Sequence, residues 1–295
     1  MYKSDDALRA LYAAQNTPQD LHTPRTLGRS GLLVGRLGFG ASHNAPSRAY
    51  ERAYELGCNY FYWGTTRRPG MAGAIRTLAP QHREKLVIAL QSYSRFGTLL
   101  RYTFLRGLKQ LRLDYADVLL LGWHNKLPSL NVLDAALRLK EEGLARAIAI
   151  SCHHRPSFAQ YITDPRFDIV MVRYNASHRG AEREVFPHLD RRETRPGLIS
   201  YTATRWGTLI DPKLTPPGQK TPTATDCYRF VLSNPHVDLC LSDPKSEEEM
   251  EQNLRALELG PLSTEELLWM RSVGDHVIEQ LKGKPQLVPF RGALK

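Results

Sequence analysis

Three side chains of the chain have chemistry suited to proton transfer, and each lies at or just after the end of a short apolar segment. His124 is one of them, because an imidazole has an ordinary pKa close to neutrality. Alternate residues of a strand point to the same side, so we expect His124 to lie on the same side as Gly122. Tyr62 and Tyr93 are phenolic alternatives, with Arg67 available to lower a phenol pKa. The sequence leaves the choice of proton donor among His124, Tyr62 and Tyr93 open.

Bulky aromatic and cationic side chains occur near the ends of the same apolar segments. Arginine binds carboxylates and phosphates through paired hydrogen bonds, so Arg67, Arg173 and Arg205 favour an anionic substrate. The alternative is that the tryptophans only pack under loops and contact no ligand. On the first interpretation, the candidate substrate contacts are Trp63, Arg67, Trp123, His153, Arg205 and Trp206.

The elements that must position these residues alternate along the chain. Short apolar segments occur at residues 34–40, 60–64, 86–91, 118–122, 147–152, 169–173, 198–201 and 237–241, with helically spaced stretches between them. Nearly continuous apolar strands are typical of a parallel sheet covered on both faces. Eight strand–helix units predict an α/β fold, a (β/α)8 TIM barrel, with its site at the carboxyl ends of the strands. A doubly wound open sheet is the alternative, but residues 38–42 are too short for its glycine-rich phosphate loop.

Glycines, prolines and helix-capping residues indicate where the domain and its elements begin and end. We expect an N-terminal extension at residues 1–22, the barrel at 23–284 and a C-terminal tail at 285–295. Gly57 and Gly143 are predicted to end helices, and Ser263 with Glu266 forms a capping pattern that opens the last helix. The proline-rich residues 205–224 predict a long loop after the seventh strand, and such loops are often functional.

Composition narrows the classes of partner. Hydrophobic residues make up 42% of the 295 residues and charged residues 24%, which is ordinary for a globular protein with a core. The net charge of +10 raises the question of nucleic acid, but the basic residues are scattered and form no dense run. No apolar run is long enough to span a bilayer, and the first residues do not resemble a signal peptide. We therefore expect a cytoplasmic protein with a small-molecule substrate and neither a nucleic-acid nor a membrane partner.

The cysteines and histidines do not indicate a metal site. The four cysteines lie at positions 58, 152, 227 and 240, and no two of them form a CxxC pair. No set of histidines and carboxylates has the spacing of metal ligands. We expect no metal, and we expect buried free thiols at Cys58, Cys152 and Cys240.

The chain resembles bacterial members of the aldo-keto reductase superfamily at several places, in the order that this family shows. The resembling segments are 25–32 and 37–40 (opening hairpin and first strand), 57–61 (second strand), 114–121 (fourth), 150–151 (fifth), 173–175 (sixth), 197–201 (seventh), and 249–254 with 262–267 (last stretch). The resemblance runs from about residue 25 to about residue 274. It implies a nicotinamide-dependent reduction of a carbonyl, or the oxidation of an alcohol, within a barrel that carries an N-terminal hairpin.

The four residues that perform the family's chemistry are absent from the corresponding positions. In the family a tyrosine protonates the carbonyl, an aspartate and a lysine lower its pKa, and a histidine orients the substrate. The resemblance puts Arg67 at the tyrosine position, Tyr62 at the aspartate, Gln91 at the lysine and Gly122 at the histidine. An acid within reach of the carbonyl is still required, so the resemblance implies a rebuilt site.

The resemblance also implies where a coenzyme, NADP or NAD, would bind. Ser151 and Arg173 correspond to residues near the nicotinamide amide, and Tyr201 to the residue that stacks on the ring. Lys245 and Ser246 open the last barrel helix, where a phosphate can bind, and Asn253 corresponds to an adenine contact. Glu249 replaces a residue that usually grips the 2′-phosphate or adenosine, and its charge favours NAD over NADP.

Three functions remain open at this point. The first is an atypical nicotinamide-dependent oxidoreductase. The second is a lyase, isomerase or hydrolase that needs no coenzyme, and the third is a catalytically silent barrel that binds a ligand or a protein. A shared fold alone does not establish which reaction a protein catalyses. The oligomeric state is also left open by the sequence.

Overall fold

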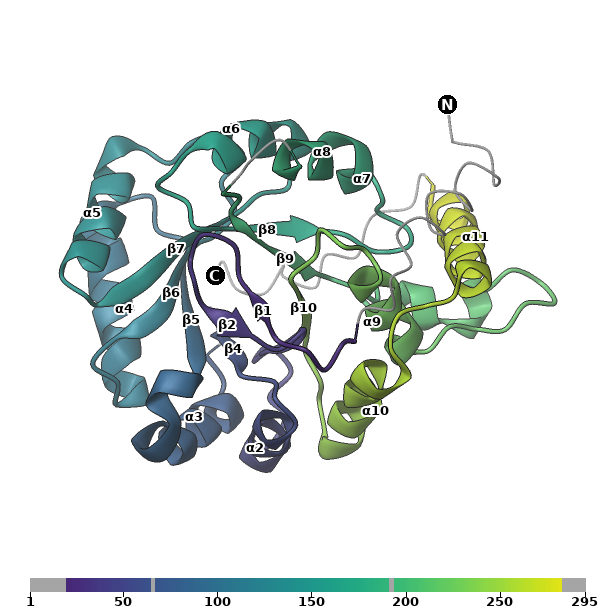
Figure 1. The fold of residues 1–295 in the computed structure, drawn as a ribbon, viewed down its shortest axis with the longest axis horizontal. Helices are drawn as coiled ribbons and strands as arrows, with labels where there is room; N and C mark the ends of the chain where they lie inside the picture. Colours follow the sequence, from purple (N-terminus) through teal and green to yellow (C-terminus); the bar gives the residue numbers. More distant parts are fainter. Residues whose placement is uncertain (1–19, 65–66, 191–193, 283–295) are drawn as a thin grey trace.

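The structure, a computed structural model, describes residues 20–64, 67–190 and 194–282. Its centre is a closed barrel of parallel strands in the order β10-β3-β4-β5-β6-β7-β8-β9, with helices around it (Figure 1). The barrel strands are β3 (Leu37–Gly40), β4 (Tyr60–Trp63), β5 (Val87–Ser92), β6 (Ala116–Leu121), β7 (Ala145–Ser151), β8 (Ile169–Arg173), β9 (Gly197–Tyr201) and β10 (Leu239–Ser242). The predicted (β/α)8 barrel is confirmed.

Helices follow the strands and cover the outer face of the barrel (Figure 1). They are α2 (Ser47–Glu55), α3 (Pro69–His82), α4 (Gly97–Leu111), α5 (Leu130–Glu141), α6 (Phe158–Thr163), α7 (Ala181–Glu184), α8 (Phe186–Leu189), α9 (Ala224–Leu232), α10 (Glu247–Leu259) and α11 (Thr264–Gln280). Gly57 and Gly143 follow α2 and α5 with φ of 85° and 74°, which confirms them as helix ends. Ser263 and Glu266 form the predicted capping box of α11.

Strand alternation divides the core into two layers. Val118 and Leu120 belong to the cluster inside the barrel, whereas Leu119 and Leu121 belong to the cluster between the strands and the helices. Because side chains of a strand alternate between its faces, every second residue near a strand end faces the barrel axis.

A hairpin closes the end of the barrel at which the strands begin. The antiparallel strands β1 (Arg25–Thr26) and β2 (Leu33–Val34) precede β3, and the hairpin lies across the barrel in Figure 1. Leu27, Leu32 and Val34 pack into the cluster inside the barrel, and Gly28 bridges to Pro196 just before β9. The carboxyl ends of the strands, at the opposite end, are left to form a site.

The seam between the first and last barrel strands is held by a buried arginine. Arg36 is 1% exposed, and its guanidinium donates hydrogen bonds to the carbonyl oxygens of Leu232, Val237 and Asp238. Burial lowers the pKa of Arg36 to about 10, so the group stays charged at neutral pH. The seam therefore depends on one side chain that satisfies three carbonyl groups.

The long connection and the chain ends predicted from sequence are described only in part. The connection at 205–224 contains two short 3-10 helices, η3 (Thr208–Ile210) and η4 (Pro212–Leu214), before α9 begins. Residues 1–19 of the expected extension and the expected tail at 285–295 lie outside the described residues. Leu21, near the end of the expected extension, is 1% exposed and belongs to the outer core layer.

The cysteines are all buried free thiols, as expected for Cys58, Cys152 and Cys240. Among the helices that the structure describes, none has the length and apolar character needed to cross a membrane.

Candidate functional site

The carboxyl ends of six strands surround one opening of the barrel, which we call the mouth. The inner core cluster is covered there by the partly buried Tyr62 and Tyr201. The mouth is defined by Tyr62 of β4, Gln91 of β5, Gly122 after β6, Ser151 of β7, Arg173 of β8 and Tyr201 of β9. These include the strand-end positions at which the sequence predicted a rebuilt site.

Tyr62 and Gln91 form a neutral hydrogen-bonded pair in the mouth. The Tyr62 hydroxyl donates to the side-chain oxygen Oε1 of Gln91. Burial raises the pKa of Tyr62 well above its ordinary value, and the neighbouring Tyr93 and the carboxylate of Asp243 act in the same direction. Tyr62 is therefore an uncharged phenol at neutral pH. The positions at which the resemblance implies an aspartate and a lysine thus hold a neutral pair.

Gly122 gives Gln91 and Tyr93 the space that a side chain would otherwise take. A Cβ atom built on Gly122 would lie 2.2 Å from Gln91 Nε2 and 2.5 Å from the Tyr93 ring. Tyr93 is 44% exposed, and its phenol interacts electrostatically with Tyr62 and Tyr201. Tyr93 therefore lies beside Gln91 where the resemblance implies a histidine, and it is more exposed than Tyr62 or Tyr201.

His124 is hydrogen-bonded to Arg95, a residue that the sequence analysis did not identify. Its Nε2 lies 2.8 Å from Nη1 of Arg95, so Nε2 must be the unprotonated acceptor of that bond. Burial and the Arg95 charge lower the pKa of His124 to about 4. The same guanidinium donates to the carbonyl oxygens of Tyr93, Gly122 and Trp123. Arg95 thus fixes the end of β6, and His124 is a poor proton donor at neutral pH.

The expected alternation from Gly122 to His124 fails at Trp123. β6 ends at Leu121, and Trp123 has a φ of 55°, a left-handed conformation that is rare for a bulky residue. The prediction that His124 continues the inward face of the strand was therefore wrong in its premise. The backbone N–H of Trp123 donates to the Ser151 hydroxyl oxygen, which helps to hold this turn.

A row of aromatic rings leads from the surface to the mouth. Trp123 is 51% exposed, and its ring centroid lies 5.2 Å from that of His153. The His153 ring lies 6.4 Å from that of Tyr201 and is tilted by 30°. These positions are compatible with the predicted substrate contacts of Trp123 and His153, which stay predictions.

Trp63 and Arg67 lie behind the barrel wall, which corrects the prediction that they contact substrate. Trp63 is 3% exposed, belongs to the outer core layer, and donates its indole N–H to the Arg68 carbonyl. The Arg67 guanidinium donates to the Thr103 carbonyl in α4 and lies 5.3 Å from the centre of the Trp63 ring. Because Trp63 alternates with Tyr62, it faces the helices rather than the mouth.

Arg173, Arg205 and Trp206 lie together at the ends of β8 and β9. The Arg173 guanidinium carbon is 4.9 Å from the centre of the Trp206 ring. Arg205 is 6% exposed, and burial together with the neighbouring Arg173 lowers its pKa. Arg205 and Trp206 both have positive φ, 50° and 53°, so the chain turns sharply here. Two residues that sequence analysis missed lie close by, Arg155 and His178; loop residues of this kind have no strand pattern to mark them.

The residues that open α10 bind one another. The Ser246 hydroxyl caps the helix by accepting from Glu249 N–H, and the Glu249 carboxylate accepts from Lys245 N–H at 2.9 Å. Asn253 is 5% exposed and donates to the Ser242 hydroxyl. The helix N-terminus already has a carboxylate of its own, so a phosphate would meet like charge there.

Some of these residues fit a nicotinamide coenzyme. Tyr201 offers an aromatic ring and Ser151 a donor for an amide oxygen, as the resemblance implies, whereas the Arg173 guanidinium lies against the Trp206 ring. Glu249 would repel a 2′-phosphate, whereas its carboxylate can accept a hydrogen bond from a ribose hydroxyl. Within the part of the chain that the structure describes, no three side chains of the metal-binding types gather around one point.

Comparisons with known proteins agree with this geometry. The profile of the Aldo/keto reductase family matches residues 47–226. Two solved structures of aldo-keto reductase AKR11C1 from Bacillus halodurans are similar: the holo form (TM-score 0.71, 19% identity, 85% of this chain and 96% of that one) and the apo form (TM-score 0.70, 20% identity, 85% and 95%). At such identities the likeness is one of fold. No curated protein sequence matches the chain.

Proposed function

Because the chain belongs to the aldo/keto reductase family, we propose that it is an oxidoreductase that interconverts a carbonyl and an alcohol with a nicotinamide coenzyme. We propose NADH as the preferred coenzyme, because Glu249 occupies the start of α10. The substrate in this proposal is a small molecule with an anionic group. Arg173 and Arg205 support that choice, because their guanidinium groups are neighbours and the Nε atom of each is buried without a hydrogen-bond partner among the described residues.

The observation that carries the proposal is the position of Tyr93 beside Gly122 and Gln91, next to the neutral Tyr62–Gln91 pair. A neutral phenol can donate a hydrogen bond to a carbonyl oxygen and pass it a proton as negative charge develops there. Tyr93 is the proposed donor, because it is partly exposed and so can recover its proton from solvent. Tyr62 would hold Gln91, and with it the Tyr93 ring, in place.

The proposed reaction is balanced by these groups. A bound nicotinamide coenzyme would supply the hydride that forms the new C–H bond. Tyr93 gives its hydroxyl proton to the carbonyl oxygen, and the resulting phenolate takes a proton from water. The positions that the resemblance assigns to an aspartate and a lysine hold the neutral Tyr62 and Gln91, so we expect slower turnover than an ion-paired tyrosine would give.

The experiment is a fluorescence titration of the full chain with NADH and with NADPH, followed by turnover on a panel of carbonyl compounds with and without a carboxylate. We expect NADH to bind more tightly, and Glu249→Gln to narrow the difference between the two coenzymes. Glu258→Gln, a change on the same helix α10, is the matched control. If neither coenzyme binds at millimolar concentration, the proposed function is wrong.

A further inference from the structure

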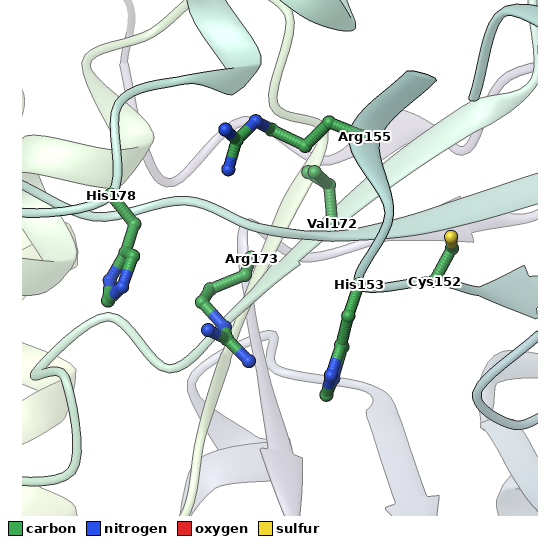
Figure 2. Close-up of a pocket in the computed structure, with 6 residues that line it drawn as sticks. All are labelled: Cys152, His153, Arg155, Val172, Arg173 and His178. Atoms are coloured by element: carbon green, nitrogen blue, oxygen red, sulfur yellow. The ribbon is translucent and has the colours of Figure 1, made fainter. Parts of the chain in front are cut away.

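A small basic pocket lies beside the mouth, between the ends of β7 and β8 and the loops that follow them. It has a volume of about 30 Å3 and is lined by Cys152, His153, Arg155, Val172, Arg173 and His178. Figure 2 shows His178, Arg173 and His153 side by side and pointing the same way, while the Arg155 guanidinium extends toward His178. The space is too small for a nicotinamide or sugar ring, but it admits a group of a few oxygen atoms.

Two buried nitrogen atoms that line this pocket have no hydrogen-bond partner in the described structure, and a third belongs to Arg205, which interacts electrostatically with His178. They are Nε of Arg173, Nε of Arg205 and Nδ1 of His178. Buried polar atoms in folded proteins are nearly always paired, and each exception requires a reason. The described structure has five other unpaired buried side-chain atoms elsewhere, but these three belong to neighbouring side chains, and one bound acceptor would explain all three. The Arg guanidinium can only donate, so the missing partner must bring oxygen atoms that accept.

The charges around the pocket are also unbalanced. Arg155 has an acidic partner, Glu184, at 2.8 Å, but Arg173 and Arg205 have none within ion-pair distance among the described residues. Arg173, Arg205 and Arg155 all face His178, and together with burial they lower its pKa to about 4. Grouped positive charges in a partly buried site attract anions.

We propose that Arg173, Arg205 and His178, with Arg155 beside them, bind the carboxylate or phosphate group of the substrate. The group would accept from the two guanidinium groups and from an Nδ1–H of His178. Arg173 is already positioned by its contact with the Trp206 ring, so little ordering is needed on binding. Only the assignment of this anion to the substrate depends on the proposed function; the anion site itself does not.

The first test measures binding of inorganic phosphate and of acetate to the protein without nucleotide, by calorimetry at constant ionic strength. We expect saturable binding of at least one of the two, which also identifies the preferred oxyanion. Arg173→Gln and Arg205→Gln should each weaken it about tenfold or more. Arg48→Gln removes an exposed charge on α2 and is the matched control. Equal binding by wild type and all three variants would overturn the proposal, because it would reflect only the net charge of +10.

A second measurement uses the wild-type protein, so it does not depend on whether the arginine variants fold. The His178 imidazole resonances of the wild-type protein, assigned by their loss in His178→Gln, are followed by NMR during a phosphate titration. A bound anion stabilises the imidazolium, so the pKa of His178 should rise from about 4. Unchanged His178 resonances at saturating phosphate would contradict the site.

The third test separates the anion site from the coenzyme. The affinity for NADH is measured with and without saturating phosphate. An unchanged affinity supports a substrate site, whereas competition would assign the pocket to a coenzyme phosphate and overturn the proposal as stated. Phosphate binding without any NADH binding would refute the proposed oxidoreductase function, and with it the assignment of the anion to that reaction's substrate, while leaving the anion site intact.

Discussion

At the scale of single residues, the mouth differs from the site that the resemblance implies, because its hydrogen-bonded pair is neutral. A buried aspartate–lysine pair holds two charges, and removing one partner leaves the other unpaired in a medium of low dielectric constant. Tyr62 and Gln91 avoid that cost because both are neutral. The consequence is chemical, since a neutral pair supplies no charge to stabilise a phenolate beside it.

Tyr93→Phe tests the proposed proton donor. We expect kcat to fall about 100-fold with little change in KM, because the hydroxyl acts on the developing charge of the transition state. Tm should stay close to that of the wild type, since the side chain is 44% exposed. Steady-state kinetics at pH 7 check the prediction, with Tyr102→Phe on α4 as the control for loss of an exposed hydroxyl. If Tyr93→Phe keeps full activity, Tyr93 is not the donor.

The lowered pKa values of His124 and His178 make the free energy of unfolding depend on pH. Both have a pKa of about 4 in the folded chain, below the ordinary value of 6.5. Between these values the unfolded chain binds two more protons than the folded one. Their contribution is therefore complete above about pH 6.5 and is lost as the pH falls toward 4, with a slope of about 2.7 kcal/mol per pH unit.

Urea unfolding from pH 4.5 to 7.5 measures that slope. His124→Gln and His178→Gln should each reduce it by about one proton, or about 1.4 kcal/mol per pH unit. His22→Gln, at an exposed histidine, serves as the control. A variant slope equal to that of the wild type would show that the histidine concerned is not buried in its neutral form.

The residue scale is also where the sequence was least informative. Tyr62 could be assigned to the mouth because the resemblance puts it at the family's aspartate position, near the end of a predicted strand. His124 could not be placed correctly, because the left-handed Trp123 and the Arg95 side chain decide where it lies. Arg95, Arg155 and His178 follow strands as loop residues, and no periodicity predicts which way a loop side chain points.

At the scale of elements, the sequence predicted the strands well. Parallel strands buried on both faces appear as continuous apolar segments, and glycines such as Gly143 mark the ends of the helices between them. The two short 3-10 helices after β9 were expected only as a loop, because a single turn of helix leaves too short a pattern to detect. The position of Trp63 behind the wall follows from alternation once the inward face of β4 is known.

The hairpin at the base of the barrel gives a test with a built-in control. A Cβ at Gly28 would lie 2.0 Å from the backbone nitrogen of Gly197, and its φ is 50°. Gly31 has a φ of 69° with no atom within 4 Å of such a Cβ. Gly31→Ala should cost about 1 kcal/mol through backbone strain alone. Gly28→Ala should cost about 3 kcal/mol or more, because backbone atoms must move.

Chemical unfolding of the two variants measures the difference. Equal losses of stability would mean that the hairpin shifts freely against β9. It would then be a loosely attached cover rather than part of the barrel's core.

At the scale of the whole molecule, closure of the barrel depends on Arg36. Arg36→Met keeps the length of the side chain but leaves three carbonyl oxygens without their donor, those of Leu232, Val237 and Asp238. At roughly 1 kcal/mol for each lost bond, we expect a loss of about 3 kcal/mol in the free energy of unfolding. Arg76→Met, with one exposed bond to the Gln110 carbonyl, should cost less than about 0.5 kcal/mol. If both variants lost a similar free energy of unfolding, Arg36 would not have a special role in closing the barrel.

The sequence positions of the Arg36 acceptors also determine when, during translation, these hydrogen bonds can form. Asp238 is 202 residues further along the chain than Arg36, so its carbonyl is made long afterwards. At elongation rates of roughly 5–20 residues per second, the wait is on the order of 10–40 seconds. During that time β3 has an open edge, and a nascent chain with an unpaired strand is prone to join another. We therefore expect the incomplete chain to be more prone to self-association than the finished barrel, in which β10 covers that edge.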